Sequence, residues 1–166
     1  MNRRRVVQAL GLMTSCALMT SQASGNTPPP SSADDQAVRN AAAKFYSALN
    51  VMFTGDAGPM KDVWSHATDV TYMGPAGGRK RGWPAVLAEW EEQAALKLGG
   101  DVRPVELHVT VGQDLAVINC WEKGQNVGAS GKVEAVSIRA TNVFRKEGGS
   151  WKMIGHHTDL LPFLVK

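Results

Sequence analysis

The feature that most constrains the fold of this chain is a change in its hydrophobic period near residue 100. Beyond that point apolar and polar residues alternate, as in segment 105–111, which is the pattern of a half-buried strand. Before it, apolar residues recur at helical spacing, as in Val38, Ala42, Phe45, Leu49 and Phe53. Because the strands are joined by short turns, helical crossovers between them are excluded. The sequence therefore predicts an α+β fold with three N-terminal helices packed on a curved antiparallel sheet.

Turn residues and periodicity together place the individual elements. Helices are predicted to begin near Asp34, Pro59 and Trp83, where acidic residues or a proline suit the first turn. A short strand is predicted for residues 69–73, ahead of the third helix. Longer strands are predicted for residues 105–111, 115–122, 133–145 and 151–157.

Residues 1–25 are typical of a secretory signal peptide, with three consecutive arginines, an apolar stretch and small residues before the expected cleavage near Gly25. The proline-rich segment 26–33 is interpreted as a spacer, and residues 34–166 as one folded domain. We therefore expect a periplasmic or secreted protein, and both the general and the twin-arginine export routes fit the leader.

Two features limit the partners that this chain is expected to have. The formal net charge is +3, but without the three leader arginines the basic and acidic residues are equal in number, so we expect no nucleic-acid partner. We expect no membrane partner unless the leader is retained or Cys16, which lies in a loose lipoprotein-like cleavage sequence, carries a lipid. If Cys16 leaves with the leader, Cys120 is alone and forms no internal disulfide.

The later part of the chain resembles a known family. The segment 138–147, the glycine turn after it, and the run Trp151 to His157 look like the end of a SnoaL-like domain of the nuclear transport factor two-like superfamily, which also holds the ketosteroid isomerases. The run is also similar to the association domain of calmodulin-dependent kinases. Segment 64–83 resembles the family's second helix, first strand and third helix, and the resemblance covers about residues 34–162.

The resemblance implies a cone-shaped α+β barrel, in which a bent sheet wraps around the first helix and a pocket opens at the wide end. Such pockets are mostly apolar with a few polar groups, so the implied ligand is a hydrophobic small molecule. Family members are commonly homodimers through the convex sheet face, and no cofactor is implied. The superfamily includes isomerases, cyclases, dehydratases, epoxide hydrolases and inactive domains, so the fold does not fix the reaction.

Five polar residues are candidates for catalysis. Asp69 is the nearest carboxylate to the first strand and could act as a base, while Tyr72 on that strand either donates to an enolate or keeps its hydroxyl in water. Asn142 is the polar member of an apolar strand face, where it either holds a carbonyl group or serves a structural network. His156 and His157 point to opposite faces of the last strand, and the alternation does not decide which one faces the pocket.

A second group of residues is expected to line the pocket: Trp64, His66, Trp90, Cys120, Glu122 and Phe144. His66 could also pair with Asp69 as an acid–base group. Cys120 is expected to be a small core residue rather than a nucleophile, because no neighbouring basic residue lowers the pKa of its thiol. The adjacent histidine side chains diverge, so we predict no metal site.

Two functions fit these features. The first is an exported small-molecule enzyme that performs proton transfer, in an isomerisation, a dehydration or a cyclisation. The second is a non-catalytic ligand-binding or dimerisation module, because the second acidic donor that ketosteroid isomerases need is not evident on the later strands.

Overall fold

The computed structural model describes residues 32–127 and 131–165. The predicted signal peptide, Cys16 and most of the proline-rich spacer lie outside these residues, so their assignments stay predictions. None of the described helices combines the length and the apolar character that crossing a bilayer requires.

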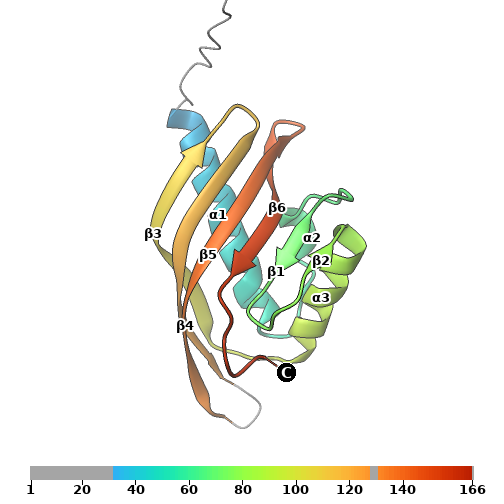
Figure 1. Ribbon diagram of the computed structural model, residues 1–166, viewed down its shortest axis with the longest axis vertical. Coiled ribbons are helices and arrows are strands. Elements are labelled where there is room, and N and C mark those ends of the chain that lie inside the picture. The colour runs from blue at the N-terminus through green and yellow to red at the C-terminus, as the bar shows by residue number, and fades with distance from the viewer. Residues whose placement is uncertain (1–31, 128–130, 166) are drawn as a thin grey trace, which may run out of the picture.

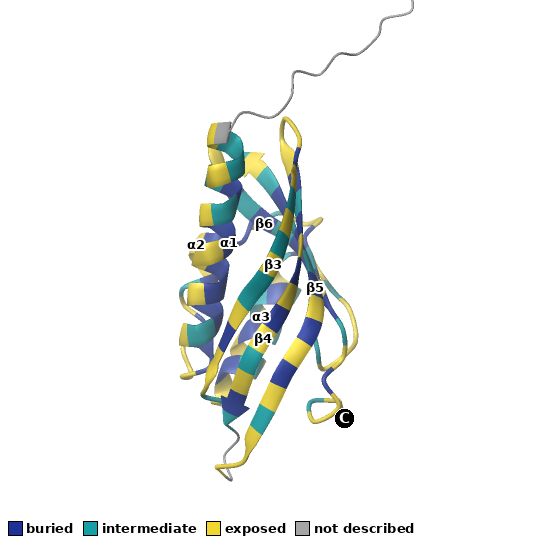
Figure 2. Cartoon of the chain, turned by 90° about the vertical axis from the view of Figure 1, so that its left-hand side faces the viewer, coloured by how far each residue is buried: buried dark blue, intermediate teal, exposed yellow. Residues whose placement is uncertain are grey.

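The longest helix, α1 (Ser32–Met52), packs along one face of the sheet. Residues of its predicted apolar face, including Val38 and Phe45, are buried, and Figure 2 shows the exposed residues on the side away from the sheet. Near the end of the helix, the Asn50 amide donates to the backbone carbonyl of Val102 at 3.1 Å and accepts from its N–H at 2.9 Å. This pair of bonds fixes the helix against the first long strand.

Two further helices and six strands complete the described fold. The helices are α2 (Met60–Val63) and α3 (Trp83–Ala95). The strands are β1 (Thr71–Met73), β2 (Lys80–Arg81), β3 (Asp101–Val111), β4 (Leu115–Val127), β5 (Val133–Glu147) and β6 (Ser150–Thr158). They form one sheet in the order β2-β1-β6-β5-β4-β3, shown in Figure 1. The predicted α+β class is confirmed, and each long strand runs further than the alternation indicated.

One strand pair departs from the expected antiparallel pattern. The strands β3 to β6 form successive antiparallel pairs, but β1 lies parallel to β6. In addition, the segment between β1 and α3 contains the short strand β2, which pairs with β1. The parallel pair places the first strand beside the last, although α3 and three long strands separate them in the sequence.

A bulge in β6 determines which histidine faces the core. Met153 and Gly155 pair with adjacent residues of β5, so Ile154 between them is an extra residue. Such a residue shifts the alternation of side chains by one position. Met153 points inward before the bulge and His156, only 4% exposed, points inward after it, whereas His157 is exposed. The question that the sequence alternation left open is thereby decided in favour of His156.

Candidate functional site

Three adjacent strands place polar side chains next to one another in the core. Tyr72 on β1 pairs with His156 on β6, and His156 pairs with Asn142 on β5. The rings of Tyr72 and His156 stack, with centroids 5.7 Å apart and planes 12° from parallel. All three residues are buried. The sheet therefore brings together three of the five predicted catalytic candidates.

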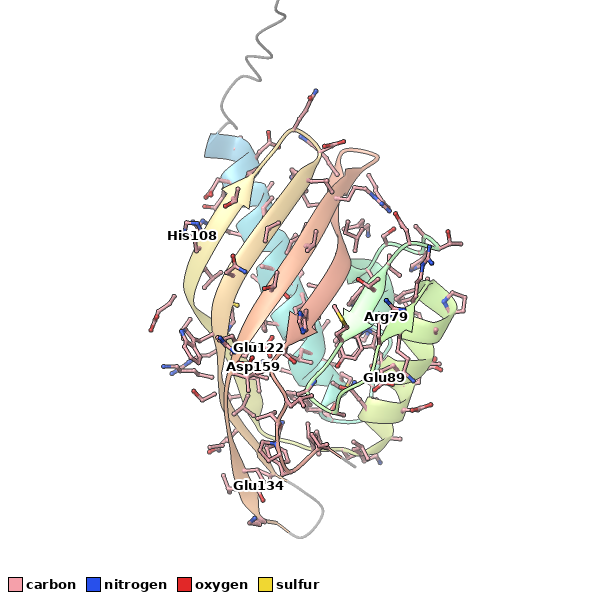
Figure 3. The ribbon with its side chains drawn as sticks, viewed as in Figure 1. Arg79, Glu89, His108, Glu122, Glu134 and Asp159 are labelled. Carbon is pink, nitrogen blue, oxygen red and sulfur yellow. The ribbon has the colours of Figure 1, made fainter. Side chains whose placement is uncertain are left out.

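Glu122 and Tyr46 lie next to Asn142 and His156. Tyr46 reaches in from α1, and its Oη lies 3.0 Å from Glu122 Oε1 on β4 and 3.0 Å from Asn142 Nδ2. Asn142 Oδ1 lies 2.6 Å from His156 Nδ1, and His156 Nε2 lies 3.7 Å from Glu122 Oε1. We call these four residues the Glu122–His156 cluster; Figure 3 labels Glu122 near the middle of the sheet.

Burial determines the charge of the cluster. It raises the pKa of Glu122 to about 7, an effect that the hydrogen bond from Tyr46 partly opposes. It also lowers the pKa of His156, and the neighbouring His157 adds to that effect. Near neutral pH, His156 is therefore neutral and Glu122 lies close to the midpoint of its titration. A carboxyl group in this condition both accepts and releases a proton readily.

A phenol faces the same interior. The Gln93 side-chain amide on α3 donates to Tyr72 Oη at 2.8 Å and to Glu89 Oε1 at 3.0 Å. Burial raises the pKa of Tyr72, so the hydroxyl keeps its proton and can donate it. Trp90 packs against the phenol ring, with centroids 4.5 Å apart.

These groups border a cavity of about 30 Å³, which has room for roughly two water molecules. Its polar lining residues are Tyr72, Gln93, Glu122, Asn126 and His156. Its walls are otherwise apolar and include Leu49, Phe53, Val136, Ile138, Leu161 and Leu164. The mixture of apolar and polar lining residues is typical of a ligand pocket, but the volume is too small for a ligand. The expected small-molecule pocket therefore stays a prediction.

The C-terminal segment covers this cavity. After β6 the chain passes the end of β1 towards α3, as Figure 1 shows, and the Leu161 N–H donates to the Pro75 carbonyl at 2.9 Å. Leu161 is buried and lines the cavity together with Leu164, whereas the neighbouring Leu160 is 56% exposed. Two leucine side chains of this segment therefore form part of the cavity wall.

Three predicted site residues lie away from the cluster. Asp69 is exposed, and its carboxylate binds Arg145 at 2.7 Å, a contact that holds the pKa of Asp69 below its usual value. His66 is also exposed and stacks on Trp83, with centroids 4.4 Å apart. His157 faces the outer side of the sheet. None of the three lines the cavity, so their positions do not favour Asp69 as the base, an Asp69–His66 pair, or His157 as a catalytic group.

The predicted lining residues divide into two groups. Trp90 and Glu122 line the cavity, whereas Trp64 and Phe144 are fully buried behind it. Cys120 is buried with its Sγ 3.3 Å from Tyr46 Oη, and burial raises the pKa of its thiol. A thiol in these surroundings stays protonated and is a weak nucleophile.

The sequence interpretation missed Tyr46, Gln93 and Asn126. Tyr46 and Gln93 lie at helical spacing from apolar residues of their own helices, and a polar residue at such a position is the signal that could have found them. Asn126 lies on the same buried face of β4 as Glu122, but beyond residue 122, where the strand was predicted to end.

The arrangement is suited to acid–base chemistry. A carboxyl group near its midpoint faces a neutral imidazole, and a phenol donor that stacks on this imidazole lines the same cavity. Such sets remove a proton beside a carbonyl group and stabilise the resulting enolate. Among the described residues, no three His, Cys, Asp or Glu side chains come together as metal ligands would.

The fold and the cluster define an α+β protein with a polar site inside its sheet. Residues 38–160 match the sequence profile of the SnoaL-like domain. The chain therefore belongs to the SnoaL-like family, and the resemblance seen in its strand and turn residues is confirmed. No curated protein sequence matches the chain.

Solved structures agree on the fold. A proposed dehydratase of the NTF2-like family from Streptomyces avermitilis superposes with a TM-score of 0.69 at 24% identity, covering 78% of this chain and 97% of that one. An NTF2-like superfamily protein from Salmonella enterica gives 0.69 at 14% identity, covering 77% and 91%. A proposed calcium/calmodulin-dependent protein kinase type II association domain from Thiobacillus denitrificans gives 0.59 at 26%, covering 74% and 94%. These likenesses show an NTF2-like fold.

The substitution Glu122→Gln tests the raised pKa of the buried carboxyl group. Because the folded pKa of about 7 lies above the usual 4.5, the stability that Glu122 contributes is complete at low pH and is lost as the pH rises through 7. Glutamine does not titrate, so the variant should gain roughly 3 kcal/mol relative to the wild type between pH 4.5 and pH 8.

Chemical denaturation at both pH values measures this gain. Tyr46, Cys120 and His156 also interact with Glu122, but they are present in both proteins, so their direct contributions largely cancel in the comparison. Glu134→Gln, at the outer end of β5, is the matched control and should show no such gain. An equal stability difference at the two pH values would contradict the raised pKa.

Proposed function

We propose that this protein is an exported enzyme that moves protons within a small, hydrophobic, uncharged molecule, in an isomerisation, a dehydration or a cyclisation. The observation that carries the proposal is the pair Glu122 and His156, buried beside one cavity with Oε1 and Nε2 3.7 Å apart. Membership of the SnoaL-like family and the likeness to a proposed dehydratase also support it. The leader sequence supports export.

In this mechanism each buried group has a separate task. Glu122 and His156 take a proton from a carbon or hydroxyl of the substrate and return it at another atom, so that no external acid or base is needed. Tyr72 donates its hydroxyl hydrogen to the substrate carbonyl oxygen, where negative charge develops. The apolar walls keep water away, which strengthens both interactions.

The lining residues favour an uncharged substrate. No Lys or Arg is among the described residues that line the cavity, so an anionic group would find no positive partner there. The ionised form of Glu122 would also repel it. A neutral molecule with one carbonyl or hydroxyl group fits the polar end, and its hydrocarbon part fits the walls.

Such a molecule needs more space than the cavity of about 30 Å³ offers. We infer that the segment 160–165 moves aside when the substrate enters. Among the described residues, one backbone hydrogen bond joins this segment to the rest of the protein, from the Leu161 N–H to the Pro75 carbonyl. The nearly filled cavity is also the observation that favours the second candidate function, a non-catalytic binding or dimerisation module.

We also propose that the protein forms a homodimer through the outer face of the sheet. A concavity of about 470 Å³ lies on this face, across β3 to β6. Trp121 is 37% exposed there, an unusual exposure for a large aromatic residue. Acidic Glu106 and the ion pair of Arg139 with Asp159 line the same concavity, so two copies related by a two-fold axis could place opposite charges together.

Enzyme-dependent deuterium uptake from D₂O tests the catalytic proposal before the natural substrate is known. A panel of neutral cyclic ketones and enones, such as 2-cyclohexenone, is incubated with the protein and followed by mass spectrometry. We expect uptake with at least one member, and a loss of about 100-fold or more in Glu122→Gln and in His156→Gln. Glu134→Gln should keep the wild-type rate. Uptake that is insensitive to both site substitutions would refute the proposal.

Substitution of the cavity leucines tests how a substrate enters. Leu161→Ala and Leu164→Ala enlarge the cavity, so each should bind the neutral probe 4-fluorophenol several-fold more tightly than the wild type, as measured by ¹⁹F NMR. Leu160→Ala removes an exposed side chain of the same segment and should leave the affinity unchanged. If all three variants bind alike, the segment does not close the site.

Native mass spectrometry of the protein recovered from its export compartment tests cleavage and assembly together. We expect a dimer whose mass corresponds to a cut near Gly25. Trp121→Asp should convert it to a monomer, because the substitution buries a charge in the proposed interface. Leu96→Asp, at the exposed end of α3, is the control and should leave the dimer intact. A wild-type monomer would exclude the proposed assembly.

A further inference from the structure

Two members of the Glu122–His156 cluster have no task in the proposed chemistry. Asn142 is 0% exposed and Tyr46 is 4% exposed, and neither lines the cavity. A substrate in the cavity therefore meets Glu122 and His156 but not these two residues. Each of them nevertheless makes hydrogen bonds to two other members of the cluster.

The hydrogen bonds of Asn142 have a defined direction. Its Nδ2 donates to Tyr46 Oη at 3.0 Å, which turns Oδ1 towards His156 Nδ1 at 2.6 Å. A carbonyl oxygen can only accept, so Nδ1 of His156 carries a hydrogen and donates it. The Tyr46 hydroxyl donates its own hydrogen to Glu122 Oε1 at 3.0 Å, and Cys120 Sγ lies 3.3 Å from the same hydroxyl.

This direction determines where the free nitrogen of the imidazole lies. A neutral imidazole has a single N–H group, and burial keeps His156 neutral. With the hydrogen on Nδ1, the lone pair is on Nε2, which faces Glu122 Oε1 at 3.7 Å. The opposite tautomer would leave two acceptor atoms 2.6 Å apart with no hydrogen between them.

We propose that Asn142 and Tyr46 are positioning residues for the acid–base pair. Asn142 holds His156 in the Nδ1–H tautomer, and Tyr46 holds the Glu122 carboxyl group opposite Nε2. The lone pair of His156 Nε2 thereby faces the Glu122 carboxyl group, and the two groups can share the proton that is moved at the cavity. The catalytic part of this statement rests on the proposed function, but the tautomer and the hydrogen-bond direction do not.

The tautomer is measured directly by NMR on the full chain with ¹⁵N-labelled histidine. Long-range ¹H–¹⁵N correlations distinguish Nδ1–H, Nε2–H and doubly protonated rings. We expect His156 to show the Nδ1–H form at pH 7, with the exposed His157 as an internal reference whose tautomers exchange. An Nε2–H form, or a doubly protonated ring at pH 7, would overturn the proposal.

The substitution Asn142→Asp tests the direction of the hydrogen bonds while keeping the shape of the side chain. A carboxylate accepts from both neighbours and carries a charge, so His156 should become doubly protonated at pH 7 in this variant. Asn119→Asp, on the exposed side of β4, is the matched control and should leave the Nδ1–H form unchanged. A neutral His156 in Asn142→Asp would overturn the role of Asn142.

The substitution Tyr46→Phe tests the second positioning residue and does not depend on the first variant folding. It removes a donor to the Glu122 carboxylate, so a ¹³C NMR titration should show the midpoint of Glu122 rising by about one pH unit. Cys120, His156 and Tyr72 also face this carboxyl group and are unchanged in the variant. An unshifted midpoint would overturn the role of Tyr46.

These readouts separate the positioning proposal from the proposed function. If His156 has the Nδ1–H tautomer and the Glu122 midpoint shifts in Tyr46→Phe, the positioning roles stand even if Glu122→Gln keeps full deuterium uptake, and only the catalytic proposal fails. If the tautomer is Nε2–H, the positioning roles fail whatever the activity.

Discussion

A carboxyl group buried without a cation has to be stabilised by hydrogen bonds, and in this protein that requirement connects three parts of the fold. Glu122 lies on β4, its hydrogen-bond donor Tyr46 comes from α1, and His156 faces it from β6. Asn142 links the last two through its amide. The position of α1 against the sheet is therefore coupled to the protonation of the cluster, because a displaced helix would leave the carboxyl group without its donor.

Local patterns in the sequence were sufficient to predict most of the fold. The apolar spacing of α1 and the alternation in β3 to β6 show which face of each element packs against the core, and the sequence periodicity is sufficient to predict this. β1 pairs in parallel with β6, and Tyr72 lies opposite His156. Because these two strands are far apart in the sequence, no local pattern predicts their pairing. The start of β4 at Leu115 was predicted, but its C-terminal end was missed because Gly124 and the polar residues beyond it interrupt the alternation.

The candidate site was predictable only in part, for the same reason. Tyr72, Asn142, His156 and Glu122 were each named from their own strands, and the sheet register brings them together. Asp69 was named from its nearness to Tyr72, yet its carboxylate binds Arg145, which is 76 positions away. Membership of the SnoaL-like family indicates the fold but not the identity of these groups.

The bulge at Ile154 links the backbone of β6 to the side chain that the strand presents to the core. Continued without the bulge from the pair Phe144 and Met153, the strand would expose His156 and turn His157 inward, opposite Ala140 rather than Asn142. The choice between the two histidines thus depends on the backbone at Ile154, a residue that does not line the cavity. Because two histidines are consecutive, either register turns an imidazole to the inner face, but the bulged register is the one that sets it opposite Asn142.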